Sequence, residues 1–125
     1  MHDSLERARL CAEAADNKKA FDIQILDLRG LTYITDYFVI CSAANTPQIS
    51  AITDSIGHDL AAQGIRAEHI EGGAESTWVL MDYADVVVHI FDEQTRAFYS
   101  LEKLWSESTR VPLAVCSAEI KNAAS

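Results

Sequence analysis

The segment Trp78–Phe91, WVLMDYADVVVHIF, decides how this chain folds. Two apolar runs flank the tetrapeptide at positions 82–85, and the segment contains no lysine or arginine. Aspartate favours turns because its carboxylate accepts hydrogen bonds from nearby backbone N–H groups. The pattern therefore predicts a β-hairpin whose second arm, VVVHIF, lies in the core.

The first arm of this hairpin has two faces that we expect to differ in exposure. Side chains alternate across a strand, so residues two apart lie on the same face. One predicted face carries Trp78, Leu80 and Asp82, and the other carries Val79, Met81 and Tyr83. One of them must pack on the core, and an aromatic, charge-poor strand left partly open is typical of a protein-docking surface.

The rest of the chain predicts a single α/β domain with a mixed five-stranded sheet. Its 125 residues are enough for one hydrophobic core. Helical spacing, caps and breakers predict helices over 4–19, 46–63 and 92–106, the second capped by Thr46. Alternating or continuous apolar runs predict strands over 21–28, 37–42 and 65–71, besides the hairpin. The stripe of the last helix is Ala97, Leu101 and Leu104. We expect the domain to cover 1–110 and a mobile tail to cover 111–125.

The charge distribution argues against direct binding of nucleic acid. The net charge is −9, and between Gly30 and Thr95 the only lysine or arginine is Arg66, against ten acids. Proteins bind nucleic acid largely by neutralising phosphates with lysine and arginine. An acidic surface instead attracts a basic protein partner, although acidity alone also serves solubility.

The sequence also favours a cytoplasmic protein without a membrane span. No apolar run is long enough to cross a bilayer, and the N-terminal residues resemble neither a secretory signal nor a transit peptide. The three cysteines are widely spaced and lack a CxxC motif, which indicates reduced thiols.

No recognised catalytic motif is present, so we expect neither enzymatic activity nor a cofactor. Asp82 and Asp85 are a candidate pair of Mg²⁺ ligands, since carboxylates bind this ion. Turn formation is the better interpretation of both residues. The four histidines are scattered along the sequence, and His89 lies within an apolar strand where a core histidine is commoner than a metal ligand.

Three runs of sequence resemble the ribosomal silencing factor family, also called Iojap-like. They are LDLRGLTYITDYFVICSAANTPQISAITDSI, EGGAESTWVLMDYADVVVHIF and RAFYSLEKLW, and the resemblance extends over about 22–105. Ala43-Ala44 departs from the family, which usually has a glycine after the Cys-Ser step.

The resemblance implies a non-enzymatic protein that binds the large ribosomal subunit through its protein number fourteen. Such a factor blocks joining of the small subunit and lowers translation when nutrients are scarce. Family members are also often homodimers. Carried over to this chain, the partner-binding residues would be Trp78, Leu80, Met81, Asp82, Tyr83 and Asp85.

The resemblance further implies a nucleotidyltransferase-like topology, which raises a rival hypothesis of residual nucleotidyltransferase activity. Cys41-Ser42 stands where those enzymes have a Gly-Ser turn, but the following dozen residues supply only Asp54 instead of a carboxylate pair. The two metal ions that a nucleotidyltransferase uses would then lack their carboxylate ligands. A third hypothesis is that the protein is a dimeric adaptor unrelated to ribosomes.

Overall fold

A six-stranded sheet forms the centre of the computed structural model, which describes residues 3–112. The strands are β1 (Phe21–Asp27), β2 (Tyr37–Ala43), β3 (His69–Glu71), β4 (Trp78–Asp82), β5 (Val86–Asp92) and β6 (Thr109–Val111). Their order across the sheet is β3-β4-β5-β2-β1-β6. The expected mixed α/β domain is confirmed, and its nucleotidyltransferase-like topology stays a prediction.

The centre of the sheet is the parallel pair β2 and β5. Their register runs from Tyr37 opposite Val86 to Ala43 opposite Asp92, while every other strand pair in residues 3–112 is antiparallel. Apolar runs without alternation suit strands that are covered on both faces. Accordingly, β2 and β5 are the most continuously buried strands of the sheet.

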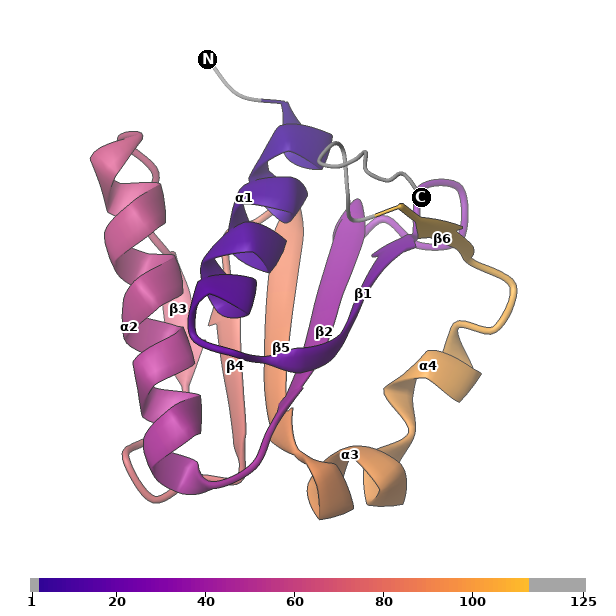
Figure 1. The fold of residues 1–125 in the computed structure, drawn as a ribbon. Helices are drawn as coiled ribbons and strands as arrows, with labels where there is room; N and C mark the ends of the chain where they lie inside the picture. Colours follow the sequence, from indigo (N-terminus) through magenta and orange to yellow (C-terminus); the bar gives the residue numbers. More distant parts are fainter. Residues whose placement is uncertain (1–2, 113–125) are drawn as a thin grey trace, which may run out of the picture.

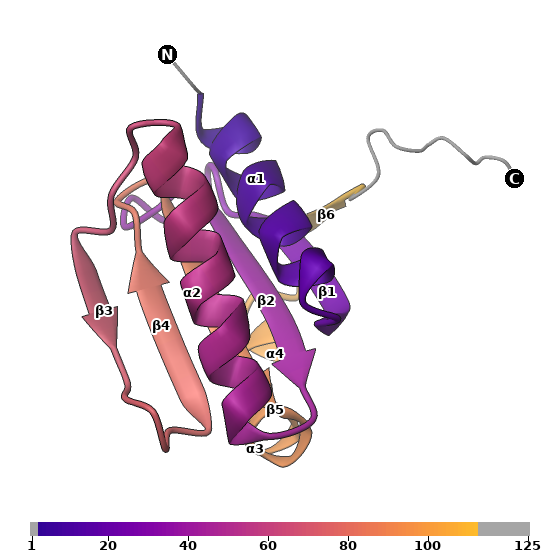
Figure 2. The ribbon, with the colours of Figure 1, turned by 60° about the vertical axis from the view of Figure 1, so that its left-hand side comes forward.

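One face of the sheet is covered by α1 (Ser4–Asn17) and α2 (Thr46–Ala62), which lie side by side (Figures 1 and 2). The expected capping box at the start of α1 is present, with Asp3 and Glu6 each accepting a backbone hydrogen bond from the other. The buried positions of α1 hold only alanine and cysteine, which lets its backbone lie close to the strands.

The α2 helix buries the expected stripe of Ile49, Ile52, Ile56 and Leu60. Its cap is Asn45 and not Thr46, because the Asn45 side chain accepts the hydrogen bond from the Gln48 N–H. Thr46 is instead the first helical residue, followed by Pro47 in the first turn, where a missing N–H costs nothing.

The other face is covered only in part, by α3 (Glu93–Tyr99) and α4 (Leu101–Leu104). The prediction of one helix over 92–106 was wrong, because Ser100 adopts a left-handed conformation at φ 49° and separates the two. The expected apolar stripe was wrong at two of its three positions, because Ala97 is exposed and Leu104 is 72% exposed. Leu101 does pack against the core, but the buried residue of α3 is Arg96.

Arg96 joins α3 to β1, β2 and α4. Its Nε donates to Glu102 Oε2 at 2.8 Å, and its Nη1 donates to the Asp22 carbonyl at 2.6 Å and to Ser42 Oγ at 2.9 Å. A buried guanidinium is tolerated only where such partners replace water. These bonds explain why a charged residue occupies the position where periodicity predicts an apolar one.

The sheet has one strand more than expected, because β6 pairs with β1 over three residues. Val111, assigned to the tail in the sequence prediction, lies opposite Ile25 in this pairing. The rest of the predicted tail, from residue 113, lies outside the described residues. Within residues 3–112, no helix combines the length and apolar character needed to cross a membrane.

The turn that leads into β4 generates a stability prediction at Gly72. Its φ is +106°, and a Cβ there would lie 2.8 Å from the Trp78 carbonyl oxygen. We expect Gly72→Ala to lower the free energy of unfolding by roughly 1–3 kcal/mol, through backbone strain and steric overlap, in urea denaturation. Gly73→Ala is the matched control, since its Cβ would meet nothing within 4 Å. Equal stability of the two variants would contradict the prediction.

Candidate protein-docking face

The two faces of β4 differ in exposure as the alternation predicts. Val79, Met81 and Tyr83 are 3%, 1% and 2% exposed and pack in the cluster beneath α1 and α2. Trp78, Leu80 and Asp82 are only partly buried, on the opposite face. Met81 and Tyr83, which the family resemblance makes contact residues, are therefore covered by this chain's own helices.

Trp78 lies in a group of rings on the open face. Its ring stacks on Phe91 with centroids 4.9 Å apart, and Tyr99 of α3 lies against it at 4.8 Å. The indole N–H donates to Nδ1 of His89 at 3.1 Å. This hydrogen bond and the ring packing fix the orientation of the tryptophan, so that its exposed part is held in place.

His89 is neutral in this environment. The side chain is 3% exposed, and burial lowers its pKa from 6.5 to about 4 because the charged form would lose its hydration. Since Nδ1 accepts from Trp78, the ring proton resides on Nε2, which is buried and without a hydrogen-bond partner among the described residues. Protonation of Nδ1 would remove the acceptor that orients Trp78.

The turn after β4 uses both aspartates for intramolecular contacts. Asp82 Oδ1 accepts from the Ala84 N–H at 2.8 Å, which confirms its interpretation as a turn former. Asp85 forms an ion pair with Arg7 of α1 at 3.0 Å, and its carbonyl accepts from the N–H groups of Asp36 and Tyr37. Asp85 therefore binds α1 through its carboxylate and the start of β2 through its backbone carbonyl.

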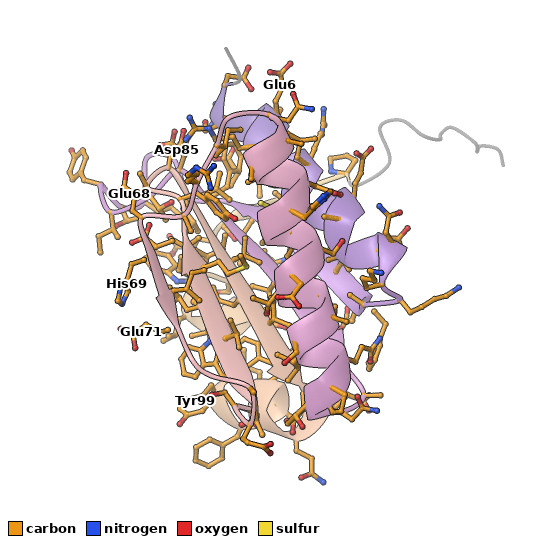
Figure 3. All side chains as sticks on the ribbon, turned by 90° about the vertical axis from the view of Figure 1, so that its left-hand side faces the viewer. Glu6, Glu68, His69, Glu71, Asp85 and Tyr99 are labelled. Atoms are coloured by element: carbon orange, nitrogen blue, oxygen red, sulfur yellow. The ribbon has the colours of Figure 1, made fainter. Side chains whose placement is uncertain are left out.

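Strand β3 adds acidic residues beside β4 that the sequence did not single out. His69 lies opposite Asp82 and Glu71 opposite Leu80, so their side chains share the open face. His69 Nε2 is hydrogen-bonded to Glu71 Oε2. In Figure 3, Glu68, His69 and Glu71 follow one another along the edge of the sheet that β3 forms, on the side away from α2. The sequence shows acidic residues around this short strand, but it does not show that β4 is the neighbouring strand in the sheet.

These residues form one continuous surface, which we call the docking face. It consists of His69, Glu71, Trp78, Leu80, Asp82 and Tyr99. Next to Tyr99, Phe98 is 80% exposed and extends the apolar part of this surface. Among residues 3–112, no group of three or more His, Cys, Asp or Glu side chains is arranged to hold a metal ion. The arrangement suits recognition of a protein surface.

The low pKa of His89 predicts a specific pH dependence of stability. A base whose pKa is depressed by folding binds more protons when unfolded, so stability is present above pH 6.5 and falls as the pH drops towards 4. We expect protonation of His89 to account for up to about 3 kcal/mol of the decrease in the free energy of unfolding. His89→Gln keeps an acceptor for Trp78 but cannot be protonated there. Its free energy of unfolding should fall less steeply over this pH range, and parallel pH profiles would refute the prediction.

Comparison with known proteins identifies the family. The family model described as "Ribosomal silencing factor during starvation" matches residues 1–125. The ribosomal silencing factor RsfS of Bacillus subtilis is 42% identical over 106 residues, covering 85% of this chain and 87% of that protein. The chloroplastic protein Iojap of Zea mays is 38% identical over 102 residues, which are 82% of this chain and 44% of the maize protein.

Solved structures agree with this assignment. A crystal structure from Bacillus halodurans matches with a TM-score of 0.74 at 38% identity, covering 84% of this chain and 95% of that one. A Chromobacterium violaceum protein matches with a TM-score of 0.80 at 31% identity, covering 94% and 98%. The three sequence runs that resemble the Iojap-like proteins, the matching family model and the shared fold lead to one conclusion: this chain belongs to the ribosomal silencing factor family.

Proposed function

We propose that this protein binds the large ribosomal subunit through that subunit's protein number fourteen and blocks joining of the small subunit. Translation would then fall under nutrient limitation. The role is non-enzymatic and cytoplasmic. Support comes from the relatives, which are named ribosomal silencing factors, and from the family description, which refers to starvation.

The observation that carries the proposal is the make-up of the docking face. Protein interfaces commonly have an apolar and aromatic centre that loses its water, surrounded by a polar rim. Here Trp78, Leu80 and Tyr99 supply the centre, and Glu71 and Asp82 supply the rim. Trp78 is already held by its neighbours, so binding would cost little side-chain entropy.

The charge of the rim indicates a basic partner surface. Glu71 on the edge strand and Glu68 just before it are exposed, and the chain as a whole carries a net charge of −9. Lysine and arginine on a ribosomal protein would be drawn to this edge by long-range attraction. Asp85 contributes less, because Arg7 already neutralises it.

A second copy of the chain is the competing occupant of the docking face. In a symmetric dimer the same patch meets itself, so acidic rims would approach each other. Like charges brought together at an interface are unfavourable. The rim around Glu71 and Asp82 therefore favours a basic partner over self-association through this face.

Leu80 offers a test of the apolar centre. We expect Leu80→Asp to weaken binding to purified large subunits at least tenfold in co-sedimentation, because it places a charge where water must be excluded. Ile34→Asp is the matched control, since Ile34 is 81% exposed in the loop between β1 and β2. Both variants should keep the circular dichroism spectrum and monomer stability of the parent.

The outcomes of this experiment separate the candidate partners. Undiminished co-sedimentation of a folded Leu80→Asp protein would overturn the proposed docking face. If the variant instead changed only the concentration-dependent mass of the free protein, the face would be a dimer interface.

Glu71 tests the charged rim separately. We expect Glu71→Lys to slow association with the large subunit several-fold at low salt and to reduce the dependence of that rate on ionic strength. Glu13→Lys makes the same charge change on the exposed side of α1 and should have a smaller effect. Equal effects of the two variants in stopped-flow kinetics would mean that only net charge matters.

A further inference from the structure

A cavity of about 390 Å³ lies beside α3 and α4, at the sheet end where β2 and β5 finish. This end of the sheet is the lower one in Figure 1. Asp22, Ser42, Arg96 and Lys103 are among the residues that line it. Its volume is within the range of small-molecule sites in proteins.

The topology explains why a cavity forms there. The chain leaves β2 for α2 on one face of the sheet and leaves its parallel neighbour β5 for α3 on the other face. Where neighbouring parallel strands send their connections to opposite faces, a crevice opens outside their carboxyl ends, and α/β proteins place ligands in it. Ser42, near the end of β2, lines this crevice.

Arg96 gives the cavity a buried donor that lacks a partner. The residue is 5% exposed, and its Nε and Nη1 atoms are hydrogen-bonded. Its Nη2 atom is buried without a hydrogen-bond partner among residues 3–112 and lies 3.6 Å from Asp22 Oδ2. The Asp22 side chain is 62% exposed. A ligand carboxylate that displaced Asp22 would give Nη2 the hydrogen bond it lacks.

Three carboxylates, from Asp22, Glu93 and Glu102, and two cations, Arg96 and Lys103, line the cavity. Glu102 is paired with Arg96 at 2.8 Å. Of the other lining residues, Glu93 and Lys103 have exposed side chains without an ion-pair partner in the described part of the chain. One free negative and one free positive group on the same rim complement a ligand that carries both signs.

From this juxtaposition we propose that the cavity binds a small zwitterion with a carboxylate and an ammonium group, the chemistry of a free α-amino acid. The carboxylate is held by Arg96 and Lys103, and the ammonium group by Asp22 and Glu93. This site is separate from the docking face and does not depend on the proposed ribosomal function.

Calorimetric titration of the full-length protein with each of the twenty standard amino acids tests the proposal. At least one should bind, whereas propionate, butylamine and inorganic phosphate, which each carry one sign of charge, should bind at least tenfold more weakly. Absence of binding by all twenty would overturn the proposal. So would phosphate or propionate binding as tightly as the best amino acid, because the site would then be a simple anion site.

Two surface variants test the assigned groups without disturbing Arg96. We expect Lys103→Gln and Glu93→Gln each to weaken amino-acid binding about tenfold while leaving the melting temperature of the free protein unchanged. Lys18→Gln and Glu13→Gln make the same changes at exposed positions of the α1 segment and should bind like the parent. Full binding by both cavity variants would place the ligand elsewhere and refute the site.

Discussion

The seven-residue parallel ladder between β2 and β5 is the interaction on which the rest of the molecule depends. Parallel neighbours cannot be joined by a tight turn, so the chain needs a long crossover, and α2 with the β3–β4 hairpin supplies it. That crossover covers one face of the sheet and leaves β4 beside β5, which brings Trp78 next to Phe91 and His89. The docking face therefore follows from the way in which two central strands are connected.

Unequal covering of the two faces is what leaves a surface available for a partner. Alanine and cysteine on α1 let two helices fit over a narrow sheet, and the side chains beneath them are almost completely buried. On the other face, α3 and α4 are too short to reach across β3 and β4. The partly covered face is the one that carries Trp78, Leu80 and Asp82 of β4.

Sequence patterns predicted the elements whose periodicity matches their burial. The hairpin, the α2 stripe and the capping box of α1 all follow from local rules, and the alternation along β4 correctly divided its two faces. The α3–α4 region could not be predicted in this way. Arg96 is buried because Asp22, Ser42 and Glu102 accept its hydrogen bonds. Two of these partners lie in strands far away in the sequence and the third in a separate short helix, so no periodic pattern marks the burial. Likewise, β6 is too short for a pattern, and its place is set by β1.

The packing around Trp78 has a spectroscopic consequence. The chain contains two tryptophans, and both Trp78 and Trp105 pack against the small cluster on the open face, while the larger cluster under α1 and α2 has none. Selectively excited tryptophan emission therefore reports on one side of the sheet only. Tryptophan fluorescence of this protein follows events on its open side, and loosening of the α1–α2 layer must be detected by another probe, such as hydrogen exchange.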